Sequence, residues 1–261
     1  MSPAIPTRSV IAFFLFAFGL TWVILLIYFL FPAQITTLFG EVSAGNPLFV
    51  LAVYSPAISA VLLVAWYAGS SGLRRFFSRL LLWRCPAPWA LFLVVGIPAV
   101  PFAAVFTSGT FNASAFEYPP LPELFGAMLF MLVLGPVEEI GWRGYVLPLL
   151  QRRMAPIWAG LLLGSIWAVW HLPAFLLSGT PQAEWGFLPF FIGSVAASVV
   201  LTPLFNISGG SILLPALFHF QMNNPLSPDA QPYDMYLWVL IAAVVVWLNR
   251  TALLRRKITV T

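Results

Sequence analysis

The chain is a succession of long apolar stretches separated by short polar connections. A helix needs about 20 apolar residues to cross the ~30 Å hydrocarbon core of a bilayer. Eight stretches are candidates for such helices: residues 10–31, 48–68, 89–106, 122–148, 156–177, 186–205, 211–224 and 235–254. The seventh would extend only about 21 Å as a helix, which is too short to cross alone. The pattern predicts an all-α polytopic membrane protein with about eight transmembrane helices in a single domain, residues 1–261.

The composition excludes most other classes of protein. Of the 261 residues, 61% are hydrophobic and only 8% are charged, whereas about a quarter of the residues of a soluble domain are charged. An ordinary soluble enzyme, a disordered chain and a nucleic-acid-binding module are therefore excluded. The net charge of +4 is too small and too scattered to bind a phosphate backbone. Cys85 is the only cysteine, which excludes a disulfide framework and a cysteine-rich metal site.

The charged residues segregate to opposite ends of the predicted helices. If the N-terminus is cytoplasmic, 11 of the 12 basic residues fall on the cytoplasmic side: Arg8, Arg74, Arg75, Arg79, Arg84, Arg152, Arg153, Arg250, Arg255, Arg256 and Lys257. Six of the eight acidic residues fall on the other side: Glu41, Glu117, Glu123, Glu184, Asp229 and Asp234. Because Lys and Arg mark the cytoplasmic side of membrane proteins, this segregation predicts that both termini are cytoplasmic.

Residues 73–83, which read LRRFFSRLLLW, have the pattern of an amphipathic helix on the membrane surface. Helical spacing places Arg74, Arg75 and Arg79 on one polar face and turns Phe76, Phe77, Leu80 and Trp83 toward the lipid. A surface anchor that contacts membrane lipids is favoured over a site for a substrate or a lipid headgroup.

The remaining charged residues lie inside the predicted helices. Glu138, Glu139 and Arg143 fall near the middle of the fourth stretch, and the two histidines, His171 and His219, fall in the fifth and seventh. Ionisable residues at this depth are costly in lipid and normally face a protein interior or a water-filled cavity. The sequence therefore predicts a polar cavity within the membrane.

Helical spacing brings these residues together. Glu139 and Arg143 are four residues apart and can form an ion pair, which leaves Glu138, about 100° further round, available for chemistry. His219 shares a helix face with Asn223 at the same spacing. A carboxylate can act as a general base, an imidazole can relay a proton, and an amide can donate to an oxyanion. A structural ion pair with packing histidines remains an alternative interpretation.

Three sequence motifs resemble those of the CAAX prenyl endopeptidase and bacteriocin-processing family of intramembrane proteases. Residues 138–144, EEIGWRG, are similar to its Glu-Glu-x-x-x-Arg motif. The pair Trp167 and His171 resembles its Phe-x-x-x-His motif, with Trp in place of Phe. The pair His219 and Asn223 resembles the third motif, His-x-x-x-Asn or Asp. The resemblance covers residues 137–224 and keeps the family's motif order.

The resemblance implies an eight-helix fold with a cavity open toward the cytoplasm. It also implies cleavage of peptide bonds near a membrane-embedded C-terminus. By position, Glu138 and His171 would activate a water molecule, and His219 and Asn223 would stabilise the oxyanion. Glu139 and Arg143 would position Glu138 and His171.

The requirement for a metal stays open at the level of sequence. Glu138, His171 and His219 can supply three ligands to a divalent metal such as zinc, as in catalytic zinc sites. They can equally act without a metal, with Glu138 as the base. The sequence lacks the His-Glu-x-x-His pattern that would decide between the two.

We therefore expect an intramembrane endopeptidase that cleaves membrane-associated peptides or proteins, prenylated or not. The resemblance favours a bacterial inner membrane as its location. Two alternatives remain: a proton- or ion-coupled transporter, whose path would use the same buried carboxylates, and a non-catalytic immunity or scaffold protein that keeps the motifs.

Overall fold

The computed structural model describes residues 5–112 and 118–255, and these are helical with no strand among them. Glu117, Arg256 and Lys257, which the charge pattern assigned to the two sides, lie outside the described residues. Within these residues, seven helical segments are long and apolar enough to cross a membrane: Ser9–Leu30, Pro47–Leu81, Ala87–Thr107, Leu121–Gln151, Pro156–Leu176, Phe187–Ile207 and Asp234–Leu254. The helix in the seventh predicted stretch, Leu213–Met222, is shorter, as predicted. The all-α polytopic membrane fold is thus confirmed.

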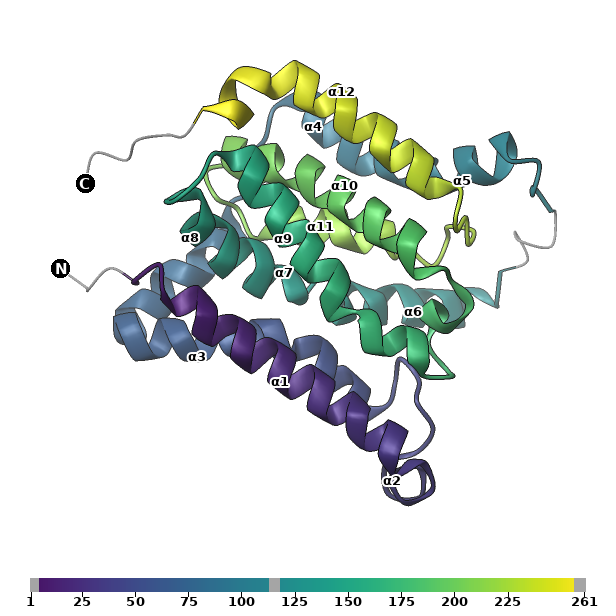
Figure 1. Cartoon of the computed structure of the whole chain (residues 1–261). Helices are drawn as coiled ribbons and strands as arrows, with labels where there is room; N and C mark the ends of the chain where they lie inside the picture. Colours follow the sequence, from purple (N-terminus) through teal and green to yellow (C-terminus); the bar gives the residue numbers. More distant parts are fainter. Residues whose placement is uncertain (1–4, 113–117, 256–261) are drawn as a thin grey trace.

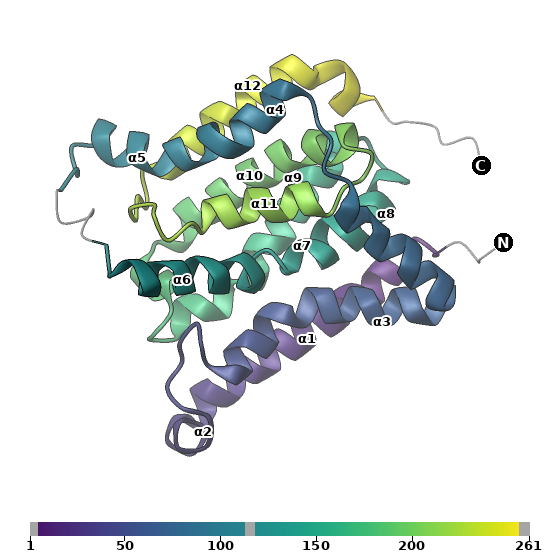
Figure 2. The same ribbon diagram turned by 180° about the vertical axis from the view of Figure 1, so that it is seen from behind.

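The long helices lie roughly side by side, and both ends of the chain emerge at the same end of the bundle (Figure 1). Helix α10 (Phe187–Ile207) packs against α9 (Pro156–Trp170) and α12 (Asp234–Leu254). On the far side, α1 (Ser9–Leu30) pairs with α3 (Pro47–Ser78). The short α11 (Leu213–Met222) lies inside the bundle, in contact with α5 (Ile97–Thr107) and α10 (Figure 2). Its polar end is therefore sheltered by protein rather than exposed to lipid.

The remaining elements are short. They are α2 (Pro32–Phe39), η1 (Arg79–Leu81), α4 (Ala87–Leu91), η2 (Phe92–Gly96), α6 (Leu121–Leu134), α7 (Glu138–Gly141), η4 (Trp142–Val146), α8 (Leu147–Gln151), η5 (Leu172–Leu176) and η6 (Pro181–Glu184).

The fourth apolar stretch is interrupted, although the sequence predicted one continuous helix. Helix α6 ends at Leu134, and α7 begins at Glu138. Pro136 has no N–H to continue the helical ladder, although the backbone of Gly135 before it keeps helical dihedral angles. The amide of Glu138 instead donates to the carbonyl of Gly135 at 3.1 Å, in a tight turn. The break places Glu138 in the first turn of a new helix near the centre of the bundle.

A second proline, Pro56, affects the hydrogen bonding of α3 near this break. Pro56 lies inside α3 and cannot donate to the carbonyl of Ala52. The hydroxyl of Thr21 donates to that carbonyl instead, at 2.9 Å, and accepts a hydrogen bond from Trp170 Nε1 at 3.0 Å. This buried network connects α1, α3 and α9.

The amphipathic helix predicted at residues 73–83 forms only in part. Gly69 has φ +62°, a left-handed conformation that glycine adopts readily, and it kinks α3 before this segment. Arg74 and Arg75 are exposed, as expected for a polar face. Phe76, however, is only 7% exposed and packs in the protein core, and Arg79 turns inward with it. Assigning one polar and one lipid face from spacing alone was therefore wrong for these two residues.

Arg79 turns inward because its guanidinium group meets two backbone carbonyls. Its Nε donates to the carbonyl of Gly210 and its Nη1 to the carbonyl of Gly144, both at 2.7 Å. Its own carbonyl accepts from the amide of Ile212 at 3.1 Å. Arg79 therefore joins the start of α11 to the π-helical segment that carries Arg143.

We expect Arg79→Met to destabilise the protein by about 2 kcal/mol, because charge-assisted hydrogen bonds to two buried carbonyls are lost. Thermal unfolding in mild detergent would measure this. Arg75→Met is the matched control, because Arg75 lies in the same segment and is exposed. Equal stability of the two variants would contradict the assigned role.

Candidate functional site

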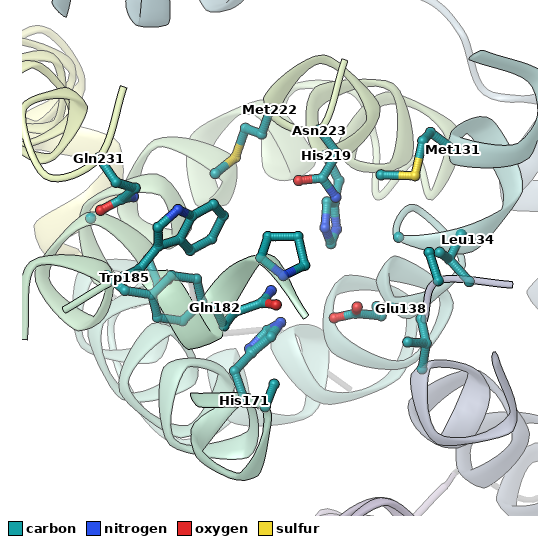
Figure 3. Close-up of a pocket in the computed structure, with 18 of the residues that line it drawn as sticks. Met131, Leu134, Glu138, His171, Gln182, Trp185, His219, Met222, Asn223 and Gln231 are labelled. Atoms are coloured by element: carbon teal, nitrogen blue, oxygen red, sulfur yellow. The ribbon is translucent and has the colours of Figure 1, made fainter. Parts of the chain in front are cut away.

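A cavity of about 460 Å³ lies within the bundle. Glu138, His171, His219 and Asn223 all line it, and their side chains face a common space (Figure 3). They come from α7, the end of α9, and α11 with its C-terminal cap. The polar intramembrane cavity expected from the sequence is thus present, and it gathers residues that are up to 85 positions apart in the chain.

Two indoles fix the carboxylate of Glu138. The side chain is 3% exposed, and its Oε2 accepts hydrogen bonds from Trp167 Nε1 at 2.9 Å and Trp142 Nε1 at 3.2 Å. Because an indole can only donate, the carboxylate oxygen is the acceptor in both contacts. Trp142 was not singled out from the sequence; its position four residues after Glu138 was the available signal. Trp167 supplies an N–H that phenylalanine, usual at this motif position, lacks.

Glu139 does not line the cavity; it forms the predicted ion pair behind it. Its Oε1 accepts from Arg143 Nη1 at 2.8 Å, and both side chains are fully buried. The same oxygen accepts from His219 Nδ1 at 3.0 Å. Glu139 therefore orients His219, whereas the sequence had paired it with Glu138 and His171. Spacing along one helix could not reveal this contact, because His219 lies 80 residues away.

The guanidinium of Arg143 also stacks on a ring. Its Cζ lies 4.8 Å from the centroid of the Trp167 ring system. Among the described residues, its Nε and Nη2 have no hydrogen-bond partner, so the cation–π contact and the Glu139 carboxylate are what stabilise its charge. Arg143 thus contacts the indole that holds Glu138, which is an indirect link to the carboxylate.

His171 is oriented from its own helix. Its Nδ1 lies 2.8 Å from the carbonyl of Trp167, and a carbonyl can only accept, so Nδ1 carries the proton. The other nitrogen, Nε2, then has a lone pair available to the cavity. The ring packs edge-on against Trp170 and Phe190, with centroids 4.7 and 5.1 Å away. These contacts hold the imidazole in one orientation.

Gly135 is a site residue that the sequence did not reveal. A Cβ atom at this position would lie 2.5 Å from Asn223 Nδ2 and 3.2 Å from His219 Nε2. The end of α6 therefore approaches α11 so closely that a larger residue than glycine would have to displace the Asn223 side chain. These two distances also show that Asn223 Nδ2 and His219 Nε2 both lie close to Gly135.

The described residues do not form a ready metal site. No group of three His, Cys, Asp or Glu side chains within 5–112 and 118–255 is placed to hold a metal ion. Glu138, His171 and His219 share the cavity, but Glu138 is already bonded through Oε2 to two indoles.

Comparison with known proteins supports the resemblance inferred from the three motifs. Residues 120–224 match the family model described as type II CAAX prenyl endopeptidase Rce1-like. The chain is also similar to CAAX prenyl protease 2 of Methanococcus maripaludis, with 27% identity over 169 residues. That similarity covers 60% of this chain and 61% of the length of the relative. The predicted resemblance to CAAX prenyl endopeptidases is thus confirmed.

Gly135→Ala should reduce the activity of this site about 10²-fold, because the added methyl group must displace Asn223, and small displacements of reacting groups have effects of that size. The protein should still fold, because the contacted amide is the end of a flexible side chain. Gly126→Ala in the same helix is the control, since a Cβ there meets nothing within 4 Å. Equal activity of the two variants would contradict the tight fit.

Trp167→Phe should lower kcat/KM about tenfold, because Glu138 loses one hydrogen-bond donor. Trp158→Phe is the control, because Trp158 lies on the same helix and is 61% exposed. Unchanged kcat/KM in Trp167→Phe would show that the indole N–H does not support the carboxylate.

Proposed function

We propose that the protein is an intramembrane endopeptidase, which hydrolyses peptide bonds of membrane-associated peptides or proteins with water activated by Glu138 and His171. The observation that carries the proposal is the convergence of Glu138, His171, His219 and Asn223 on one cavity. The similarity of residues 120–224 to a family of prenyl endopeptidases supports the reaction class.

In the proposed reaction, a water molecule sits between the carboxylate of Glu138 and Nε2 of His171. Glu138 accepts a proton from the water as its oxygen attacks the substrate carbonyl carbon. The C–N bond then breaks, and the proton passes to the leaving amine. The two indole donors orient the carboxylate before the attack, and the edge-on aromatic contacts keep His171 in place.

The oxyanion would be stabilised from the opposite side of the cavity. Nδ2 of Asn223 is a hydrogen-bond donor, and Nε2 of His219 becomes one when the ring is protonated. Glu139 accepts from Nδ1 of His219 and so fixes the orientation of the ring. Both nitrogens lie near the same point beside Gly135, as expected of two donors that share one oxygen.

The charge pattern supports an orientation for this enzyme. We propose that both termini are in the cytoplasm, because the described basic residues other than Arg143 lie at the end of the bundle where the chain begins and ends. The proposed location, a bacterial inner membrane, rests on the family resemblance. Prenylated and unprenylated substrates both fit this proposal.

Glu138→Gln should reduce peptide cleavage by at least about 10²-fold, because the amide cannot accept the proton of the attacking water. Cleavage of a mixture of prenylated and unprenylated peptides by purified protein, read by mass spectrometry, would test this. Glu123→Gln is the control, because Glu123 is exposed on α6. Full activity of Glu138→Gln would overturn the mechanism, and a repeat with a chelator would test for a metal requirement.

A further inference from the structure

One end of the bundle carries the described basic residues other than Arg143. They lie before α1, between α3 and α4, between α8 and α9, and at the end of α12. Direct contacts bring these segments together. Arg152 Nη1 donates to the carbonyl of Ile5 at 2.6 Å, and Arg79 binds the carbonyl of Gly210. We call this end of the bundle the basic end.

The opposite end carries the described acidic residues other than Glu138 and Glu139. They lie in the connections after α2, before α10 and before α12, and in the first turns of α6 and α12. These connections also meet one another. Trp185 Nε1 donates to Asp229 Oδ2 at 2.9 Å, and Tyr118 donates to the carbonyl of Leu226 at 2.8 Å. We call this end the acidic end.

The cavity reaches the acidic end. Beyond the four site residues, it is lined by connections that belong to that end: Ala44, Pro181, Gln182, Trp185, Asp229 and Gln231. Figure 3 shows Gln182, Trp185 and Gln231 around the same space as Glu138 and His171. Five of the lining helices contribute residues from the halves that lead to the acidic end: α1 and α9 from their C-terminal halves, and α3, α10 and α12 from their N-terminal halves. Helix α5 contributes Ile97 and Pro101 from its N-terminal half, and α6 contributes Met131 and Leu134 from its C-terminal half.

No connection of the basic end lines the cavity among the described residues. Fully buried side chains fill the bundle between Glu138 and that end. Four of these side chains have no exposed surface: Trp142, Arg143, Val146 and Ile212. Arg79 links the two segments that carry them, because it donates to the carbonyls of Gly144 and Gly210. A peptide therefore has a way to Glu138 from the acidic end and meets packed protein from the basic end.

We propose that the site receives substrates from the non-cytoplasmic side of the membrane. Lys and Arg concentrate on the cytoplasmic side of membrane proteins, so the acidic end, with the mouth of the cavity, faces away from the cytoplasm. The substrates are then peptide or protein segments that are exposed on, or reach the membrane from, the non-cytoplasmic face. The identity of the ligand as a peptide rests on the proposed function, whereas the sidedness does not.

The proposed side of the cavity mouth differs from the one that the resemblance implies. A cavity open toward the cytoplasm and two cytoplasmic termini cannot both hold for this chain, because the cavity mouth and the described basic connections lie at opposite ends. The distribution of charge decides between them here, since reversing the orientation would place four separate basic segments on the wrong side of the membrane.

Labelling with a membrane-impermeant maleimide tests the sidedness without any need for activity. In a Cys85→Ser background, Ala183→Cys reports on an exposed residue at the cavity mouth, and Ser78→Cys reports on an exposed residue at the basic end. We expect Ala183→Cys to react in intact spheroplasts and Ser78→Cys to react only after permeabilisation. The reverse pattern overturns the proposal. A reporter that is active only outside the cytoplasm, fused at the C-terminus, gives an independent answer: activity of that fusion also overturns it.

Cleavage in oriented membrane vesicles separates the sidedness from the enzymatic activity. An impermeant peptide added outside right-side-out vesicles should be cleaved, while the same peptide added outside inverted vesicles should not. Cleavage only in inverted vesicles would overturn the sidedness and leave the endopeptidase intact. Labelling as expected, with no cleavage in vesicles of either orientation or after solubilisation, would leave the sidedness intact and count against the endopeptidase.

Discussion

The buried contact between Glu139, Arg143 and His219 is the interaction on which the site depends. Two fully buried charges are stable in a bundle only when each compensates the other, and removing one partner of such a pair typically costs about 3–5 kcal/mol. Glu139 satisfies this demand and uses the same oxygen to hold His219. The contact between Glu139 and His219 therefore ties α11 to α7. The same carboxylate that compensates the buried charge of Arg143 also orients an imidazole.

The break after α6 allows Glu138 and Glu139 to face different surroundings. In a continuous helix through Pro136, the position of α6 would fix the direction in which Glu138 points. The turn at Gly135 instead starts a new helix, whose first residues are Glu138 and Glu139. The first turn of α7 then presents one carboxylate to the cavity and the other to the buried ion pair. Gly135 adds the second requirement, because a side chain at that point would displace Asn223.

The two ends of the bundle have different roles. At the basic end, Arg79 binds the backbone carbonyls of Gly144 and Gly210. Side chains with no exposed surface fill the bundle between this end and Glu138. At the acidic end, connections with polar side chains surround the cavity, and α11 is too short to reach from one end to the other. Among the described residues, the connections that line the cavity thus belong to the acidic end alone.

The sequence by itself determined the number and order of the apolar helices, because about 20 apolar residues are needed to cross a bilayer. It also determined the Glu139–Arg143 pair, because residues four apart share a helix face. The tertiary structure decided contacts between segments far apart in the chain: Glu139 with His219, Trp167 with Glu138, and Arg79 with Gly210. It also decided which connections line the cavity. Periodicity fixes the face on which a side chain lies, but the partner that meets that face is fixed only when the helices pack.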